Sequence, residues 1–137
     1  QWLVMYLRRS GGQSQFSAPL NAAPARRDEI RRTQEWIAAD PSRDCAVALL
    51  AERARMSPRN FARVFRSEVG MTPARYVESC RVDVARSLLE TSELTIAEIA
   101  RRTGVGDAAT LHRLFERRLA TTPAAYRRHF RREGSSP

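Results

Sequence analysis

The sequence predicts an all-α fold of seven helices, arranged as two similar halves joined by one long helix. From Asp28 onward the apolar residues recur at helical spacing, and no stretch shows the sustained alternation of a half-buried strand. One sequence motif also occurs twice, as FRSEVGMTPARY at 65–76 and as FERRLATTPAAY at 115–126. A chain of 137 residues suits one compact domain or two very small ones.

We expect residues 1–27 to be the remnant of an upstream domain followed by a linker. Residues 8–27 hold two Gly, two Pro and three Ser with little periodic hydrophobicity, which is typical of a linker. The apolar run WLVMYL is far shorter than the ~20 residues that cross a bilayer. Because the chain starts with Gln1 rather than Met, we interpret it as the tail of a longer protein.

The first two predicted helices precede Ser57, and the second of them is short. The first is expected to start near Asp28 and to end before Pro41, since proline disfavours helix in the residue that precedes it. Asp44 is expected to cap a second helix that carries Leu50 and Ala51 on its apolar side.

The third and fourth helices have stronger start signals. Ser57 and Pro58 combine a capping hydroxyl with a proline in the first turn, and Gly70 is the expected stop of the third helix. Thr72-Pro73 starts the long linking helix, residues 73–91, so that 28–72 form the first subdomain. The predicted apolar stripe of the linking helix, which reaches to Leu89, consists of Val77, Cys80, Val84 and Leu88.

Residues 92–137 repeat this plan as a second subdomain with a C-terminal helix. Each of its three helices begins with Thr or Asp at the expected cap position. The expected bounds are Thr95 to Gly104, Asp107 to Leu119, and Thr122-Pro123 to near Arg131.

The repeat defines the unit that is duplicated. Leu50-Ala51 matches Ile99-Ala100 at an offset of about 49, whereas the downstream residues match at about 50, so one residue is inserted in the second turn. Each copy is therefore a short helix, a tight turn and a longer helix. This is the helix-turn-helix pattern, in which the second helix can lie in a major groove of DNA.

The second helix of the first copy carries a basic ridge. Phe61, Val64, Phe65 and Val69 form its expected core stripe. On the opposite side Arg59, Arg63 and Arg66 fall at i, i+4 and i+7, where three guanidinium groups would repel one another without an anionic partner. A groove lined with phosphates and guanine acceptors supplies that partner.

The second helix of the second copy has a less charged outer face. We expect it to bury Leu111, Leu114, Phe115 and Leu119. Small-residue and methyl contacts are expected from its outer side, with Arg113 as the main polar reader, so this half should discriminate bases less strongly. The outer residues are Ala108, Ala109, His112, Arg113 and Arg117, with Glu116 among them.

Charge and composition limit the partners. Arg and Lys number 24 against 15 acidic residues, which leaves +9 and a pI of about 11.2. This balance points to nucleic acid first and a membrane surface second. Cys45 and Cys80 stand alone, without the spacing of a metal site or a disulfide framework, and fit a reducing, cytoplasmic setting.

No enzyme, cofactor or metal site is predicted. No Gly-rich phosphate loop follows a strand, no Ser, His and Asp triad has a scaffold, and no carboxylate pair sits in an apolar surround. The alternative from another class is a basic helical module that binds RNA or a protein partner. Single-stranded RNA recognition usually needs exposed aromatic residues, and here these fall on the inward stripes.

The motifs MSPRNFARVFR, GVGDAATLHRLFERR and TTPAAYR closely resemble those of the AraC/XylS family of transcription regulators, over roughly residues 30–131. The stretch RRSGGQSQFSAPL resembles the linker of the GlxA-type subgroup, whose members carry an N-terminal PfpI-like sensor domain. The resemblance implies sequence-specific binding of double-stranded DNA, and it allows contact with RNA polymerase. A small-molecule effector would act only through the missing N-terminal domain, and no membrane partner is implied.

The resemblance also implies roles for individual residues. Arg66 and Arg117 are placed for phosphates. Two residues depart from the family pattern. Val105 stands where an aromatic residue is common, and Ala120 stands where glycine is common, so that the lack of glycine weakens the expected end of the helix. The implied base contacts are Arg59, Ala62 and Arg63 in the first copy and Ala108, Ala109, His112 and Arg113 in the second.

Overall fold

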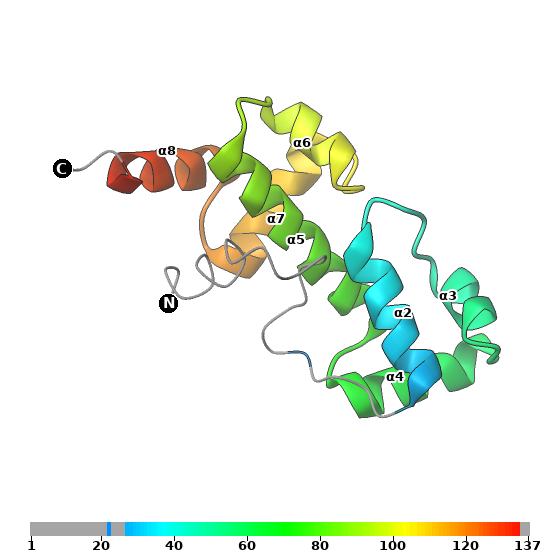
Figure 1. The fold of residues 1–137 in the computed structure, drawn as a ribbon. Coiled ribbons are helices and arrows are strands. Elements are labelled where there is room, and N and C mark those ends of the chain that lie inside the picture. Colours follow the sequence, from blue (N-terminus) through cyan, green and yellow to red (C-terminus); the bar gives the residue numbers. More distant parts are fainter. Residues whose placement is uncertain (1–21, 23–26, 135–137) are drawn as a thin grey trace. The chain divides into compact units, whose positions relative to one another are not determined.

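The computed structural model describes residues 22 and 27–134, and every regular element among them is a helix (Figure 1). The all-α prediction is confirmed. Most of the predicted upstream remnant and linker, residues 1–27, lies outside the described residues. The helices are α2 (Asp28–Ala39), α3 (Val47–Arg53), α4 (Pro58–Val69), α5 (Pro73–Thr91), α6 (Ile96–Arg102), α7 (Ala108–Leu119) and α8 (Pro123–Gly134).

Side-chain caps fix where most of these helices begin. In five of them a hydroxyl or carboxylate oxygen accepts a hydrogen bond from the backbone N–H three residues later, which satisfies a donor that the helix leaves open. The acceptors are Ser57 (3.2 Å), Thr72 (3.2 Å), Thr95 (3.1 Å), Asp107 (2.8 Å) and Thr122 (3.1 Å). Hydrogen bonds from the side chain and the backbone of Thr110 also lower the pKa of the Asp107 carboxyl.

Two predicted boundaries were wrong. Asp44 does not cap α3, because the helix starts at Val47 and its cap residue is Ala46, which makes no side-chain capping bond. A capping side chain reaches only the first turn after its own position, and Asp44 lies two residues too early. Helix α8 continues past Arg131 to Gly134, since its predicted end is not followed by a residue that stops a helix.

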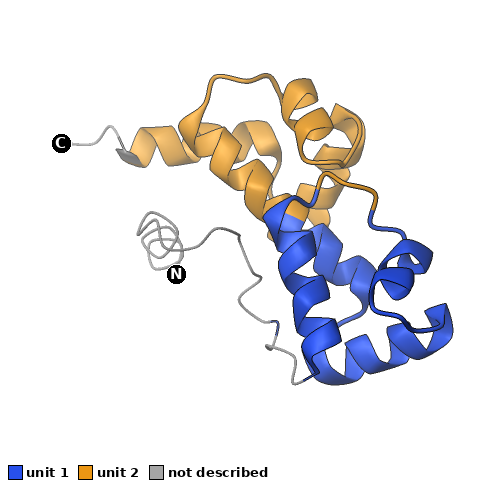
Figure 2. Cartoon of the chain, turned by 45° about the vertical axis from the view of Figure 1, so that its right-hand side comes forward, with its two compact units in different colours: residues 1–41, 45–80 blue, residues 42–44, 81–137 orange. Residues whose placement is uncertain are grey.

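The chain divides into two compact units, coloured separately in Figure 2. The first comprises residues 1–41 and 45–80, and the second comprises 42–44 and 81–137. Each has its own hydrophobic core. The fully buried residues of the first core include Ile30, Ile37, Leu50, Phe61, Phe65, Val69 and Cys80, and those of the second include Ala85, Leu89, Ile99, Ala100, Leu111 and Phe115.

Helix α5 contributes to both cores, which corrects its predicted apolar stripe. Val84 and Leu88 are only partly buried, and the second half of the helix buries Val82, Ala85 and Leu89 instead. The helix changes its buried side because a different core begins there. A single stripe drawn along the sequence could not show this change.

Left-handed residues confirm that the two copies share one design. Gly70 (φ 91°) and Ala120 (φ 57°) end α4 and α7, and the N–H of each bonds to the carbonyl four residues earlier. The turns before α4 and α7 contain a second such pair, Arg55 (φ 60°) and Gly104 (φ 87°). Ala120 thus forms the same helix end as glycine does, in a conformation that disfavours a β-carbon.

Candidate nucleic-acid interface

Helix α4 has one buried side and one cationic side. Its buried residues are the four predicted for the core stripe, and the rings of Phe61 and Phe65 lie 5.5 Å apart. Arg59, Arg63 and Arg66 are all exposed on the outside, with Ala62 half-buried beside them. The structure therefore brings the four predicted residues of this helix together on one accessible surface, which we call the α4 ridge.

The α4 ridge is not neutralised by its own helix. The acidic residue of α4 is Glu68, and its carboxylate accepts a 2.9 Å hydrogen bond from the Arg27 backbone and lies 3.6 Å from the Arg27 guanidinium. Among the described residues, neither the Arg59 nor the Arg66 side chain makes a hydrogen bond or ion pair. Like charges at this spacing are unfavourable, so the ridge favours an anion from outside.

One contact on the α4 ridge was missed at the sequence level. Arg63 Nη2 donates a 2.6 Å hydrogen bond to Asn60 Oδ1, one turn earlier. The bond orients the guanidinium without removing its charge, and it leaves other donors of the fork open. The signal was the i, i+3 spacing of Asn60 and Arg63, which places the two side chains side by side on a helix.

Helix α7 presents the second predicted set. Ala109, His112, Arg113 and Arg117 are exposed, and Ala108 is half-buried. Inside, Leu111, Leu114 and Phe115 are buried as predicted, but Leu119 is only partly buried and packs at the edge of the second core. Leu119 lies at the end of the helix, where fewer neighbours cover it.

The polar contacts of α7 explain its weaker positive charge. His112 Nε2 lies 3.6 Å from a carboxylate oxygen of Glu116, and both side chains are exposed. Arg113 Nη2 donates a 3.3 Å hydrogen bond to the Thr110 hydroxyl, a neutral partner. A carboxylate on the outer side of α7 therefore offsets part of its charge, whereas the α4 ridge has none.

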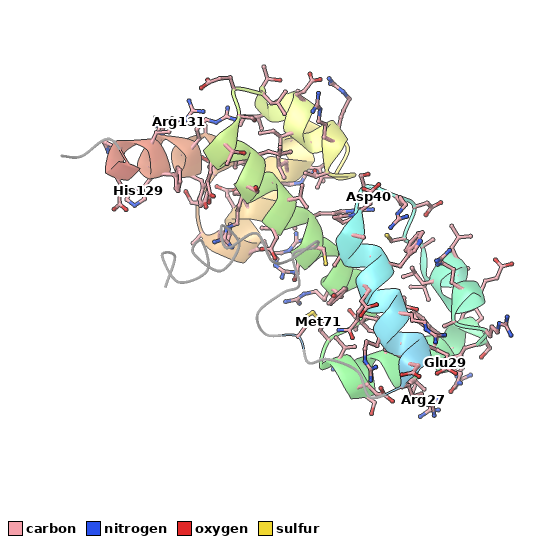
Figure 3. The ribbon with its side chains drawn as sticks, in the orientation of Figure 1. Arg27, Glu29, Asp40, Met71, His129 and Arg131 are labelled. Carbon is pink, nitrogen blue, oxygen red and sulfur yellow. The ribbon has the colours of Figure 1, made fainter. Side chains whose placement is uncertain are left out.

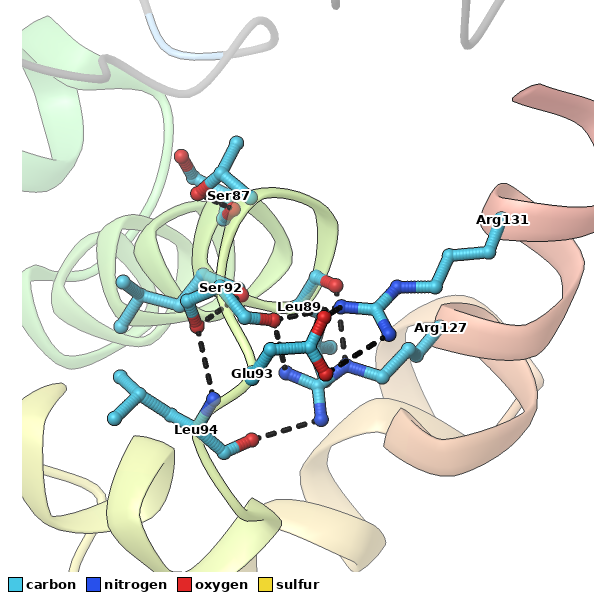
Figure 4. A network of polar contacts seen from close by, with 9 residues as sticks. Ser87, Leu89, Ser92, Glu93, Leu94, Arg127 and Arg131 are labelled. Carbon is cyan, nitrogen blue, oxygen red and sulfur yellow. Dashed lines mark hydrogen bonds and ion pairs between the residues drawn. The ribbon is translucent and has the colours of Figure 1, made fainter. Parts of the chain in front are cut away.

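A clamp from α8 holds the loop that leads into the second helix-turn-helix (Figure 4). Arg127 donates to the backbone carbonyls of Leu89 (3.1 Å), Leu94 (2.8 Å) and Ser92 (3.1 Å). Arg131 Nη2 donates to the same Ser92 carbonyl at 2.7 Å and also pairs with the Glu93 carboxylate at 3.1 Å. Burial, and then the charge of Arg131, lower the pKa of Arg127. The Leu89 carbonyl lies in the last turn of α5, and those of Ser92 and Leu94 lie in the loop that follows, so the two arginines supply donors to backbone acceptors that the helix end leaves open.

A buried polar group lies between α5 and α8. The Tyr126 hydroxyl donates to the Glu90 carboxylate, and the Tyr126 ring centre is 5.8 Å from the Arg86 guanidinium. Arg86 in turn lies 3.6 Å from Asp83. Burial raises the pKa of Tyr126 to about 12. In the first unit the equivalent Tyr76 is buried as well and donates to the Gln34 carbonyl at 3.4 Å, so both tyrosines are braces of the core.

The described residues contain no group of three or more His, Cys, Asp or Glu side chains that could hold a metal ion. The helices in the same part of the chain are all too short or too polar to span a membrane.

Comparison with known proteins places this arrangement among bacterial regulators. A family model described as a helix-turn-helix domain matches residues 50–129. The HTH-type transcriptional regulator Rv1931c of Mycobacterium tuberculosis is 51% identical over 81 residues, which cover 59% of this chain and 31% of that protein. A putative AraC-like transcription regulator of Streptomyces lividans is 36% identical over 90 residues, 66% of this chain and 30% of that one. The chain spans about a third of the length of these curated relatives.

Solved structures show the same fold. The DNA-binding domain of AdpA, a global transcriptional factor crystallised in complex with a target DNA, matches with a TM-score of 0.75 at 36% identity. That match covers 80% of this chain and 100% of that chain. The C-terminal domain of AraT, a response regulator from Geobacillus stearothermophilus, matches with a TM-score of 0.72 at 28% identity, over 75% of this chain and 86% of that chain.

Proposed function

Because the chain belongs to the helix-turn-helix family of AraC-type transcription regulators, we propose that it binds double-stranded DNA and reads sequence with α4 and α7. The observation that carries this proposal is the α4 ridge. Three exposed arginines lie on the second helix of a helix-turn-helix, and the one acidic residue of that helix is paired elsewhere. A DNA groove offers this surface both phosphates and base acceptors.

Family membership decides between the classes that the sequence left open. The relatives are transcription regulators rather than enzymes, as predicted. RNA or protein binding through the ridge is not favoured, since Phe61, Phe65 and Phe115 are fully buried and form no stacking platform on the outside.

Residue roles follow from position on the two helices. Phosphate contacts are assigned to Arg66 and Arg117, which lie toward the C-terminal ends of α4 and α7. A guanidinium fork can bind the two acceptors of guanine, which supports base reading by arginines nearer the helix starts. The residues proposed to contact bases are Arg59, Ala62 and Arg63 on α4 and Ala108, Ala109, His112 and Arg113 on α7.

The whole protein is proposed to be a longer, cytoplasmic regulator. The curated relatives are about three times as long as their match to this chain, which leaves room for a sensor domain. The likeness of residues 8–20 to GlxA-type linkers supports a PfpI-like domain upstream, through which a small-molecule effector would act. Contact with RNA polymerase is the further partner that this class of regulator allows.

A mobility-shift experiment tests DNA binding directly. The protein is titrated against a duplex that carries two half-sites about one helical turn apart, taken from fragments that the protein retains from genomic DNA. We expect a discrete complex that single strands and RNA of the same sequence compete for poorly. Equal competition by single-stranded RNA would reject the proposal in favour of the RNA-binding alternative.

A further inference from the structure

A second cationic site lies in the first unit, and no residue of α4 lines it. It is a hollow of about 460 Å³ between α2 and the end of α3, and Figure 3 shows Glu29 at the first turn of α2. We call it the α2–α3 hollow. Its lining consists of Glu29, Arg32, Thr33, Arg53, Ala54 and Arg55.

The charge of the α2–α3 hollow is unbalanced, with three arginines and one glutamate. Arg53 stacks over the Trp36 ring with its guanidinium carbon 4.2 Å from the ring centre, which holds that cation in place. Among the described residues, the Arg32 and Arg55 side chains form no hydrogen bond or ion pair. The hollow is of a size that takes a small ligand or a short stretch of peptide.

The internal repeat indicates which kind of ligand the α2–α3 hollow can bind. At the offset of about 49 that relates the two copies, Arg32 corresponds to Arg81 and Arg55 to Gly104. Arg55 and Gly104 also share the left-handed backbone conformation, with φ 60° and 87°. The buried faces agree as well, because Thr33 and Gln34 of α2 correspond to Val82 and Asp83 of α5, and all four are buried.

In the second unit the corresponding place is occupied by chain. The non-helical segment Ser42–Asp44 belongs to that unit and lies against its turn. A β-carbon on Gly104 would lie 2.8 Å from the Ser42 Cα and 3.0 Å from the Arg81 side chain. Arg81 Nη2 donates a 3.2 Å hydrogen bond to the Arg43 carbonyl. An arginine at this position thus donates to a backbone carbonyl of a non-helical segment.

We propose that the α2–α3 hollow binds a non-helical, acidic segment of a partner polypeptide. Arg32 donates to a backbone carbonyl of the bound segment, as Arg81 does in the second unit, and Arg53 and Arg55 pair with its acidic side chains. The segment lies farther from the turn than Ser42–Asp44 does, because Arg55 carries a β-carbon where Gly104 has none. A peptide fits better than DNA because polypeptide fills the equivalent place and no residue of α4 lines the hollow. The site is independent of DNA reading by the α4 ridge.

The test is an NMR titration of the ¹⁵N-labelled chain with an end-capped eight-residue peptide of alternating Glu and Gly, and with the matched Gln and Gly peptide. We expect the largest shifts at the amides of Thr33, Ala54 and Arg55, with the Glu peptide only. Arg32→Gln and Arg55→Gln should each weaken binding about fivefold, the effect of losing one charged contact of about 1 kcal/mol. Glutamine keeps the β-carbon at position 55, so that variant removes the charge without opening the turn, and an unchanged spectrum elsewhere shows that each variant is folded.

Arg128→Gln is the matched control, because Arg128 is an exposed arginine on α8. It should leave peptide affinity within about twofold, as expected for an exposed charge that does not line the hollow. The proposal is overturned if the shifts centre on α4 or spread evenly over the exposed arginines, or if the control weakens binding as much as Arg32→Gln does. Duplex DNA that shifts the amides of the hollow more than those of α4 would also overturn it, since the hollow would then belong to the DNA-binding surface.

Discussion

Arg59, Arg63 and Arg66 share one side of α4 because a helix returns to the same side every three to four residues. Contacts with other residues decide how this side is charged and how its side chains are oriented. A hydrogen bond to Asn60 orients the Arg63 guanidinium. The Glu68 carboxylate binds Arg27, a residue 41 positions earlier in the chain, and so does not pair with the arginines of the ridge.

The two arginines at the end of the ridge should behave differently when removed. Arg63→Ala is expected to cost about 1–3 kcal/mol of binding free energy and to relax the preference at one base position. Arg66→Ala should weaken binding to all sequences alike and reduce the slope of log K against log salt by about 1. Binding measured at several salt concentrations on matched and mismatched duplexes separates these roles. Equal losses on every sequence for both variants would contradict the assignment.

Ala120 should be a position where glycine stabilises the fold. Its φ of 57° is costly for a residue with a β-carbon, so Ala120→Gly is expected to raise the free energy of unfolding by about 1 kcal/mol. Gly70→Ala, the reverse change at the equivalent position, should lower it by a similar amount, because a β-carbon there meets no atom within 4 Å and only the backbone conformation opposes it. Urea unfolding measures both, and a loss of stability in Ala120→Gly would contradict the role of the left-handed end.

At the scale of helices, the sequence predicted those features that depend on neighbours in the chain. The caps at Ser57, Thr95 and Asp107 are local, and the structure confirms them. The clamp by Arg127 could not be predicted, because its acceptors are backbone carbonyls 33 to 38 residues away. Every residue has such a carbonyl, so the sequence does not mark the ones that are used. The buried side of α5 was wrong for a related reason, since burial there depends on which core the helix faces.

Loss of the clamp should destabilise the second unit. Arg127→Gln cannot keep three hydrogen bonds to carbonyls, and we expect the free energy of unfolding to fall by about 2 kcal/mol. Arg128→Gln changes an exposed neighbour on the same helix and should alter it by less than about 0.5 kcal/mol. Hydrogen exchange at the amides of α6 should speed up in the first variant only. Equal effects of the two substitutions would show that the clamp contributes nothing.

The Tyr126 hydroxyl should make stability depend on alkaline pH. Its pKa is raised in the folded state to about 12, above the value of about 10 expected for an unfolded chain. The stabilisation of the folded state by the protonated Tyr126 hydroxyl is therefore complete below pH 10. It is lost as the pH rises toward 12, because the unfolded state releases this proton first. Urea midpoints at pH 9 to 12 should fall less steeply for Tyr126→Phe than for the wild type. Parallel curves would contradict this account.

At the scale of the whole molecule, one chain carries two similar units, each with a helix whose outer side is exposed. Their outer sides differ, since α4 is strongly cationic and α7 carries the His112–Glu116 pair. The two helices proposed to read DNA belong to one polypeptide, so the proposed DNA site need not be palindromic. The duplication was visible in the sequence because two copies of one unit keep the same capping and core residues.

The most direct test of this account is selection from a pool of random duplexes, followed by sequencing of the bound fraction. The account predicts two enriched blocks whose centres lie about one helical turn, roughly 10.5 base pairs, apart. The block read by α4 should be the more sharply defined, and it alone should blur in the Arg63→Ala variant. A single enriched block, or a bound pool without any sequence preference, would contradict the claim that both outer helices read DNA.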